Sequence, residues 1–190
     1  VNEDYAEALK WFQKSAEQGD DVAQYHIGLS YDCGNGVAQD DVECVKWYHM
    51  SAEQGNAEAQ GALGGIYTTS GLGVDEDHDE AYKWYRMSAE QGYAEAQYWV
   101  GDSFLEYAWI SVDQPPDHTE AAKWLRKAAE QGHSAAQDVL GFLYFEGDGV
   151  IEDFVEAYKW FNLAAAQGDE RAKGRRDDVT KKMTIEQIAE

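Results

Sequence analysis

The sequence predicts an all-α protein made of about five helix-turn-helix repeats of 36–40 residues each. The phrase Ala-Glu-Gln-Gly occurs four times and a relaxed copy once, with glycines spaced 36, 37, 40 and 36 residues apart. A tryptophan stands eight residues before each glycine. These positions are Gly19, Gly55, Gly92, Gly132 and Gly168, with Trp11, Trp47, Trp84, Trp124 and Trp160. Periods of this length are typical of stacked supersecondary units, which present extended surfaces to partners.

The first helix of each repeat, helix A, is predicted to begin at an Asp-x-x-Glu motif. The five motifs start at Asp4, Asp40, Asp77, Asp117 and Asp153. In a capping box the aspartate accepts a free first-turn N–H, and the glutamate reaches back to the N–H of the aspartate. We therefore expect helix pairs starting near residues 4, 40, 77, 117 and 153.

Helix A is expected to turn its tryptophan inward. A small residue stands three positions before each tryptophan and an alanine five positions after it, and both offsets lie on the same side of a 3.6-residue helix. Small residues alternating with one ring suit two closely packed helices. The glycine that follows is expected to end the helix in the left-handed conformation.

The second helix, helix B, carries a recurrent internal glycine. In the first four repeats the order is Ala-Gln, then this glycine, then an aromatic residue three positions later. The glycines are Gly28, Gly64, Gly101 and Gly141, and the aromatics are Tyr31, Tyr67, Phe104 and Tyr144. Glycine inside a helix costs about 1 kcal/mol relative to alanine, so its recurrence indicates a packing requirement. The prediction is close approach of the helix-A tryptophan to the backbone of helix B.

The repeat unit resembles the Sel-1-like repeat family, relatives of the tetratricopeptide repeats. The resemblance rests on motifs such as Ala81-Tyr82-Lys83-Trp84, Leu63-Gly64 with Tyr67, and Gly-x-Gly-Val loops such as 34–37 and 147–150. It covers essentially residues 1–175 and implies a right-handed α/α superhelical solenoid with an adaptor or scaffold role. The expected division is a repeat solenoid over residues 1–168 and a C-terminal capping segment over residues 169–190.

The composition limits the classes of partner that the chain is expected to bind. The chain has 37 acidic and 15 basic residues, a formal net charge of −22 and a pI of about 4.4. Such a surface repels nucleic acid and anionic headgroups, and favours a protein or peptide partner that carries basic groups, or simply solubility. No apolar run approaches the length of a membrane span. We expect no nucleic-acid binding, no membrane insertion and, as the simpler state, a monomer.

The ends of the chain are expected to lie inside a longer array. Residues 1–4 align with the inter-repeat loops 37–40, 74–77 and 150–153, and no initiator methionine is present. The compartment stays open. A disulfide across the loop between Cys33 and Cys44 also stays open, although Cys44 occupies a column that is alanine in the other repeats and therefore suits a small core residue.

Catalytic and metal-binding patterns are weak. Some cysteine-rich members of the family have been linked to β-lactam hydrolysis, so a hydrolase is the alternative function, but no Ser-x-x-Lys, nucleophile elbow or phosphate loop is present. The five histidines form no i, i+4 pair; His78 and His118 each follow a capping aspartate, one repeat apart, which is too far for one ion to bridge. The sequence predicts no catalytic residue, no cofactor and no metal site.

The predicted binding surface lies along helix A. In the solenoids that this sequence resembles, helix A lines the concave face, and its outward positions lie two before and two or three after the tryptophan. Aromatic residues and methionine mixed with long polar side chains suit a peptide-binding surface. The candidates are His49, Met50, Tyr82, Arg86, Met87, Arg126, Lys127 and Tyr158. The competing interpretation is that Tyr82 and Tyr158 pack against neighbouring helices.

The third loop breaks the repeat. Thirteen positions separate Phe104 from Asp117, compared with nine or ten in the other loops, and Gly-x-Gly-Val is absent. Tyr107 and Trp109 stand in its place, so one hypothesis is a partner-specific rim element. The alternative is that helix B runs longer and these aromatics fold over the Trp84 repeat.

Overall fold

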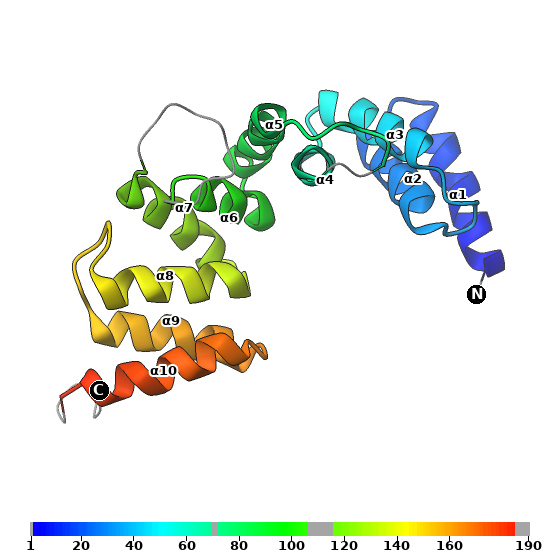
Figure 1. Ribbon diagram of the computed structural model, residues 1–190. Helices are drawn as coiled ribbons and strands as arrows, with labels where there is room; N and C mark the ends of the chain where they lie inside the picture. Colours follow the sequence, from blue (N-terminus) through cyan, green and yellow to red (C-terminus); the bar gives the residue numbers. More distant parts are fainter. Residues whose placement is uncertain (1, 70–71, 106–115, 185–190) are drawn as a thin grey trace. The chain divides into compact units, whose positions relative to one another are not determined.

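The computed structural model describes residues 2–69, 72–105 and 116–184, which contain ten α-helices and no strand. The chain divides into two compact units, residues 1–93 (unit 1) and residues 94–190 (unit 2). Unit 1 contains α1 (Asn2–Ala16), α2 (Asp21–Cys33), α3 (Asp41–Glu53), α4 (Ala57–Thr68) and α5 (His78–Glu90), and unit 2 contains α6 (Ala94–Asp102), α7 (His118–Glu130), α8 (Ser134–Glu146), α9 (Phe154–Ala166) and α10 (Glu170–Lys182) (Figure 1).

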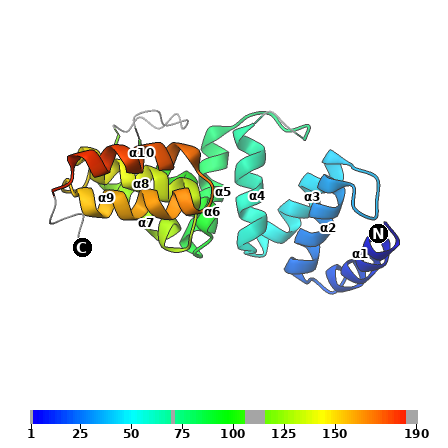
Figure 2. The same cartoon turned by 90° about the horizontal axis from the view of Figure 1, so that it is seen from below.

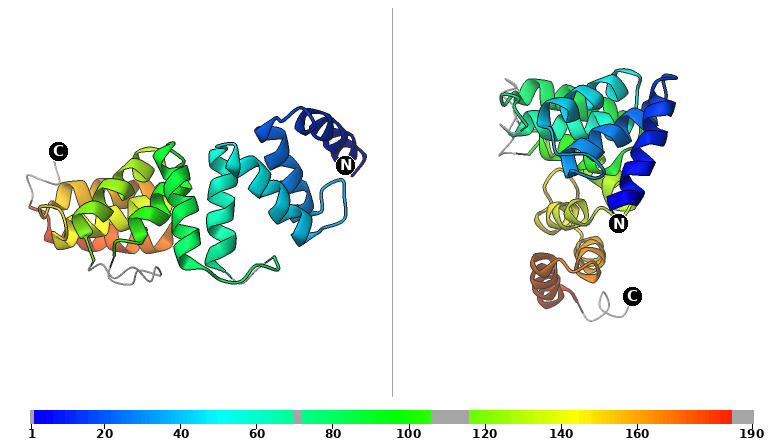
Figure 3. Two further views of the ribbon diagram at one scale, coloured as in Figure 1. Left: turned by 90° about the horizontal axis from the view of Figure 1, so that it is seen from above. Right: turned by 90° about the vertical axis from the view of Figure 1, so that its right-hand side faces the viewer.

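Consecutive helices pack side by side within each unit. The contacts run from α1 to α5 in unit 1 and from α6 to α10 in unit 2, where α8 also touches α10 (Figures 2 and 3). Odd-numbered helices are the predicted helix A and even-numbered helices the predicted helix B. Within a unit, each helix B therefore touches both the helix A before it and the helix A after it.

The capping aspartates start four of the five A helices as predicted. The carboxylates of Asp40, Asp77, Asp117 and Asp153 accept first-turn N–H groups. The second half of the capping box is wrong. Each aspartate donates its own N–H to the backbone carbonyl of the helix-B aromatic residue before it, at 2.9–3.2 Å; the pairs are Asp40–Tyr31, Asp77–Tyr67, Asp117–Phe104 and Asp153–Tyr144. The motif glutamate therefore does not accept the N–H of the aspartate, and it pairs with a lysine three residues later.

The first repeat departs from this pattern. Helix α1 begins at Asn2, so Asp4 lies inside the helix instead of capping it. Trp11 is 61% exposed, whereas Trp84, Trp124 and Trp160 are at most 9% exposed. The prediction that every tryptophan is buried is therefore wrong for Trp11, over whose ring the Lys14 ammonium lies at 4.3 Å.

None of the helix-B glycines meets the predicted tryptophan: three meet another ring, and Gly101 meets Leu125. The closest neighbour is the residue after the tryptophan, in the next helix A. A Cβ on Gly28 would lie 2.7 Å from the Tyr48 ring, and one on Gly141 would lie 2.9 Å from the Phe161 ring. Close approach to the backbone of helix B is confirmed, but it joins successive repeats instead of the two helices of one repeat.

Glutamines join the repeats through buried hydrogen bonds. From the second repeat on, the glutamine that precedes the repeat glycine donates its side-chain amide to a buried helix-B glutamine of the preceding repeat, at 2.6–2.8 Å. The pairs are Gln54–Gln24 and Gln91–Gln60 in unit 1, and Gln131–Gln97 and Gln167–Gln137 in unit 2. Gln60 and Gln137 in turn donate to helix-A carbonyls of their own repeats. A buried amide must be satisfied, so this ladder fixes the register between repeats.

The C-terminal segment contains a regular helix. Although the helix-B pattern decays after Gly168, α10 forms and buries Ala172 and Val179. Residues 185–190 of the predicted capping segment lie outside the described part of the chain.

Candidate functional site

The predicted helix-A surface of unit 1 is partly exposed. Met50 and Met87, each three residues after a tryptophan, are 39% and 40% exposed. His49, two residues after its tryptophan, lies 3.2 Å from the Tyr67 hydroxyl, and its ring meets Trp84 of the next repeat edge-on at 5.6 Å. This contact brings the exposed edges of α3 and α5 together.

Tyr82 and Arg86 share one turn of α5. The Arg86 guanidinium donates to Glu90 at 2.8 Å and to the Tyr82 hydroxyl at 3.4 Å, and both Tyr82 and Arg86 are partly buried. Their side chains therefore support the surface that Met50 and Met87 expose.

The corresponding residues of unit 2 engage rings of their own repeat. Arg126 is bonded to the Tyr144 hydroxyl, with its guanidinium 5.5 Å from the ring, and the Lys127 ammonium lies 3.7 Å from the Trp124 ring. Tyr158 is partly buried and packs against the core around Phe161. The position two before the tryptophan is not a surface position in every repeat, because Leu9 and Ala122 are buried.

The loop candidates Tyr107 and Trp109 fall outside the described residues. Of the described residues on either side of this loop, Asp117 donates its N–H to the backbone carbonyl of Phe104, as the equivalent aspartates do in the other repeats. The insertion therefore leaves the start of α7 in register. The hypothesis of a rim element stays a prediction.

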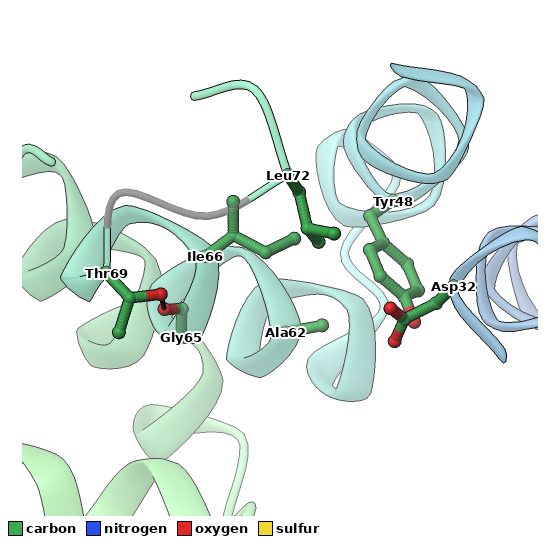
Figure 4. Close-up of a pocket in the computed structure, with 7 residues that line it drawn as sticks. All are labelled: Asp32, Tyr48, Ala62, Gly65, Ile66, Thr69 and Leu72. Carbon is green, nitrogen blue, oxygen red and sulfur yellow. Dashed lines mark hydrogen bonds between the residues drawn. The ribbon is translucent and has the colours of Figure 1, made fainter. Parts of the chain in front are cut away.

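A cavity of about 220 Å³ lies on the helix-B side of unit 1. It is lined by Asp32 of α2, Tyr48 of α3, residues of α4, and Leu72 beyond it. The α4 side contributes Ala62, Gly65 and Ile66, with Thr69 just after the helix. Figure 4 shows the Asp32 carboxylate and the Tyr48 hydroxyl on one side, facing Ala62, Ile66 and Leu72. We call this the Asp32 cavity.

The Asp32 cavity has a negative electrostatic environment. Asp32 stands in the last turn of α2, where the helix carbonyls are negative and where no basic residue stands. Burial, with Asp32 as a further cause, raises the pKa of Tyr48, so its hydroxyl stays protonated. Burial likewise raises the pKa of the neighbouring Cys44 thiol to about 12. Cys33 and Cys44 are both free thiols, which answers the question of their pairing.

A second cavity of about 200 Å³ occupies the equivalent place in unit 2, lined by Phe142 and Phe145 of α8, Phe161 of α9, and Arg175 and Asp178 of α10. The register shows the equivalence. Asp32 and Phe145 each follow the helix-B glycine by four residues, Tyr48 and Phe161 each follow the tryptophan, and Ala62 and Arg175 each follow the loop glycine by seven residues. We call this the Arg175 cavity.

The Arg175 cavity contains an internal cation. The Arg175 guanidinium lies 4.8 Å from the Phe142 ring and 6.0 Å from the Phe161 ring. It also pairs at 2.7 Å with Asp138, whose side chain is completely buried and receives Arg171 at 2.7 Å as well. A buried carboxylate requires such compensation.

A cluster of polar and aromatic side chains surrounds His133 at the start of α8. His133 Nδ1 accepts the N–H of Ala136 as the helix cap, which leaves Nε2 to donate to Glu95 at 2.9 Å. The same ring stacks on Tyr98 at 4.7 Å. The hydrogen bond from His133 lowers the pKa of Glu95, while burial raises the pKa of Tyr98 to about 12. Every ring atom available for bonding is engaged, so the cluster is structural.

In the described residues no group of three or more histidine, cysteine, aspartate and glutamate side chains has a metal-binding arrangement. His78 pairs with Glu76 at 3.0 Å, and His118 pairs with Asp148. Among the helices that the structure describes, none has the length and apolar character needed to cross a membrane.

Sequence reasoning missed both cavities. A signal was present, because Asp32 stands in a column that otherwise holds Thr68, Leu105 and Phe145. A single acidic residue among apolar and neutral ones indicates a cavity only when the position of the neighbouring helix is known. Ala62, which lines the cavity opposite it, shows nothing unusual by itself.

The repeat pattern identifies the family. The Sel1 repeat model matches residues 1–20, 21–56, 57–93, 94–133 and 134–169. The chain belongs to the Sel1 repeat family. Each longer matched block begins at a helix B and ends after the following helix A, which is the pair that the helix-B glycine holds together.

Solved structures agree with this assignment. A Sel1 repeat protein from Oxalobacter formigenes is 33% identical, with a TM-score of 0.83 over 92% of this chain and 49% of that one. A protective antigen of uropathogenic Escherichia coli with an SLR fold is 31% identical, with a TM-score of 0.60 over 95% and 46%. The chain therefore spans about half the length of these two proteins.

A third structure is similar in fold alone. Helicobacter pylori cysteine-rich protein B is 18% identical, with a TM-score of 0.53 over 72% of this chain and 94% of that one. No curated protein matches the chain. The predicted class, an all-α solenoid of about five repeats, is confirmed, and Sel1 repeat proteins generally act as protein-interaction scaffolds.

Proposed function

We propose that this chain is a noncatalytic scaffold that binds a protein or peptide along its helix-A surface. The observation that carries the proposal is the exposed edge formed by α3 and α5 in unit 1. Met50 and Met87 are each about two-fifths exposed at equivalent positions, and the contact between His49 and Trp84 joins the two helices between them. Flexible, polarisable methionines suit a surface that adapts to a peptide.

The predicted candidates divide into two roles under this proposal. Met50, Met87 and Lys127 supply exposed side chains, and His49, Tyr82, Arg86, Arg126 and Tyr158 hold the surface through contacts within their units. The net charge of −22 favours partners that carry basic groups and disfavours nucleic acid.

The serines support a noncatalytic role. The hydroxyls of the buried Ser51 and Ser88 donate at 2.6 Å to the carbonyls of Asp21 and Ala57 in the preceding helix B. The hydroxyl of the buried Ser103 donates to Val100. A hydroxyl engaged with backbone and without an adjacent base is not activated as a nucleophile.

Display selection of short peptides against the whole chain tests the surface. We expect the double variant Met50→Asp, Met87→Asp to weaken binding of the selected peptides by about tenfold or more, since it places charge in the apolar contact. Val22→Asp, Val42→Asp is the matched control, because Val22 and Val42 are 51% and 72% exposed and the double substitution adds the same two charges. Unchanged binding to the double variant, or equal weakening by the control, would contradict the proposal.

A further inference from the structure

The Asp32 cavity is separate from the helix-A surface. Its lining residues come from the end of α2, from α4 and the residues after it, and from Tyr48, which is buried on α3. Its polar groups are a carboxylate and a protonated hydroxyl, and the remaining walls are Ala62, Ile66 and Leu72 with Gly65 and Thr69 (Figure 4). Any ligand must therefore present one polar end and an apolar stem.

The carboxylate has no cation from its own unit. Residues 1–93 contain five lysines and arginines against eighteen aspartates and glutamates, and all five cations are engaged elsewhere. Four pair with glutamates, in the pairs Lys10–Glu7, Lys46–Glu43, Lys83–Glu80 and Arg86–Glu90, and Lys14 lies over Trp11. Within the described residues no lysine, arginine or histidine pairs with Asp32, although the end of α2 itself favours a positive charge there.

The size of the cavity indicates one side chain. About 220 Å³ is smaller than the roughly 300–1,000 Å³ of ordinary small-molecule sites. Apolar walls leading to a carboxylate match the methylene stem and charged head of a long basic side chain, which keeps its stem on apolar surface.

Unit 2 shows how a cation fits this place. The Arg175 side chain, from the position that Ala62 holds in unit 1, puts its guanidinium over the rings of Phe142 and Phe161. Phe161 is the counterpart of Tyr48. In unit 1 the alanine supplies no such side chain and the carboxylate stands at the opposite wall. The Asp32 cavity thus has room for a cation that the side chains of unit 1 do not supply.

We infer that the Asp32 cavity binds the lysine or arginine side chain of a protein partner, with the ammonium or guanidinium on the Asp32 carboxylate and the stem along Ala62, Ile66 and Leu72. The source of the side chain rests on the proposed scaffold function. The cavity itself does not, because it is lined from α2, from α4 and from the buried Tyr48 of α3, whereas Met50 and Met87 are exposed on α3 and α5.

Methyl NMR spectra of the whole chain, titrated with N-acetyl-lysine methylamide, test the inference. We expect saturable shifts of the Ile66 and Leu72 methyl groups, with an affinity on the order of millimolar for so small a probe. N-acetyl-norleucine methylamide has a similar stem without the charge, and we expect it to bind at least about tenfold more weakly.

Three variants locate the effect. Asp32→Asn should weaken binding by about tenfold or more, while Glu53→Gln, which removes one exposed charge from the end of α3, should leave it within about twofold. Ala62→Leu should abolish the shifts by filling the cavity. Equal binding of the norleucine compound, or an unchanged affinity in Asp32→Asn, would overturn the inference. Retention of the shifts in Met50→Asp, Met87→Asp would separate this site from the helix-A surface, and their loss would overturn the separation.

Discussion

The Asp32 cavity and the Arg175 cavity occupy the same place in the repeat and differ in how charge is balanced. In unit 2 the arginine is supplied by α10 and is neutralised by the buried Asp138. In unit 1 an alanine replaces the arginine, and an aspartate replaces the phenylalanine at the opposite wall. The backbone plan is conserved between the two places while the chemistry is inverted. Tyr25 also stands where unit 2 has Asp138, so three side-chain differences separate the internal ion pair from the half-site.

The difference also separates structural from functional charge. Asp138 is completely buried, receives two arginines and holds α8 to α10. Asp32 is partly buried, its negative charge stands at the negative end of α2, and it forms no ion pair within the part of the chain that the structure describes. A carboxylate that does no structural work in an acidic unit is a candidate for recognition.

Removing each carboxylate gives the largest expected contrast. We expect Asp138→Ala to lower the free energy of unfolding by about 3 kcal/mol, since it leaves a broken ion-pair network at the α8–α10 contact. Asp32→Asn should change it by less than about 0.5 kcal/mol. Urea unfolding followed by circular dichroism measures both, and a large loss in Asp32→Asn would show that its charge is structural.

The adjacent glycines of α4 give a smaller contrast. A Cβ on Gly64 would lie 2.6 Å from the Tyr85 ring, whereas one on Gly65 meets only the Tyr85 hydroxyl at 3.5 Å. Gly64→Ala should therefore cost about 1–3 kcal/mol by overpacking, and Gly65→Ala should gain about 0.5–1 kcal/mol because alanine favours a helix. Thermal unfolding of the two variants checks this order, and equal effects would contradict the assigned contact.

Much of the fold could be predicted from the sequence because it depends on local rules repeated five times. Asp40 and its equivalents cap helices through a carboxylate and the next few N–H groups, and both are fixed by spacing along the chain. The errors arose where a contact joins successive repeats. Gly28 of helix B meets the ring of Tyr48, which follows the next tryptophan, and Asp40 donates its N–H to the backbone carbonyl of Tyr31. Both partners lie in another helix, so neither can be found from the pattern of one helix.

The candidate surface could be predicted only in part. Exposure of Met50 and Met87 follows from helical periodicity. The Asp32 cavity depends on the side chain that Ala62 lacks and on the register of three helices, and no periodicity encodes either. The columns of the repeat contained this information only when compared across units, as Arg175 shows for the position of Ala62.

A double-mutant cycle between Ala62→Arg and Asp32→Asn shows whether the Asp32 cavity is a place for a cation. The substitution copies into unit 1 the residue that unit 2 already carries. We predict a favourable coupling of about 0.5–1 kcal/mol between the new guanidinium and Asp32, together with loss of N-acetyl-lysine methylamide binding in Ala62→Arg. Additive effects on the free energy of unfolding, with the probe still bound, would contradict the account.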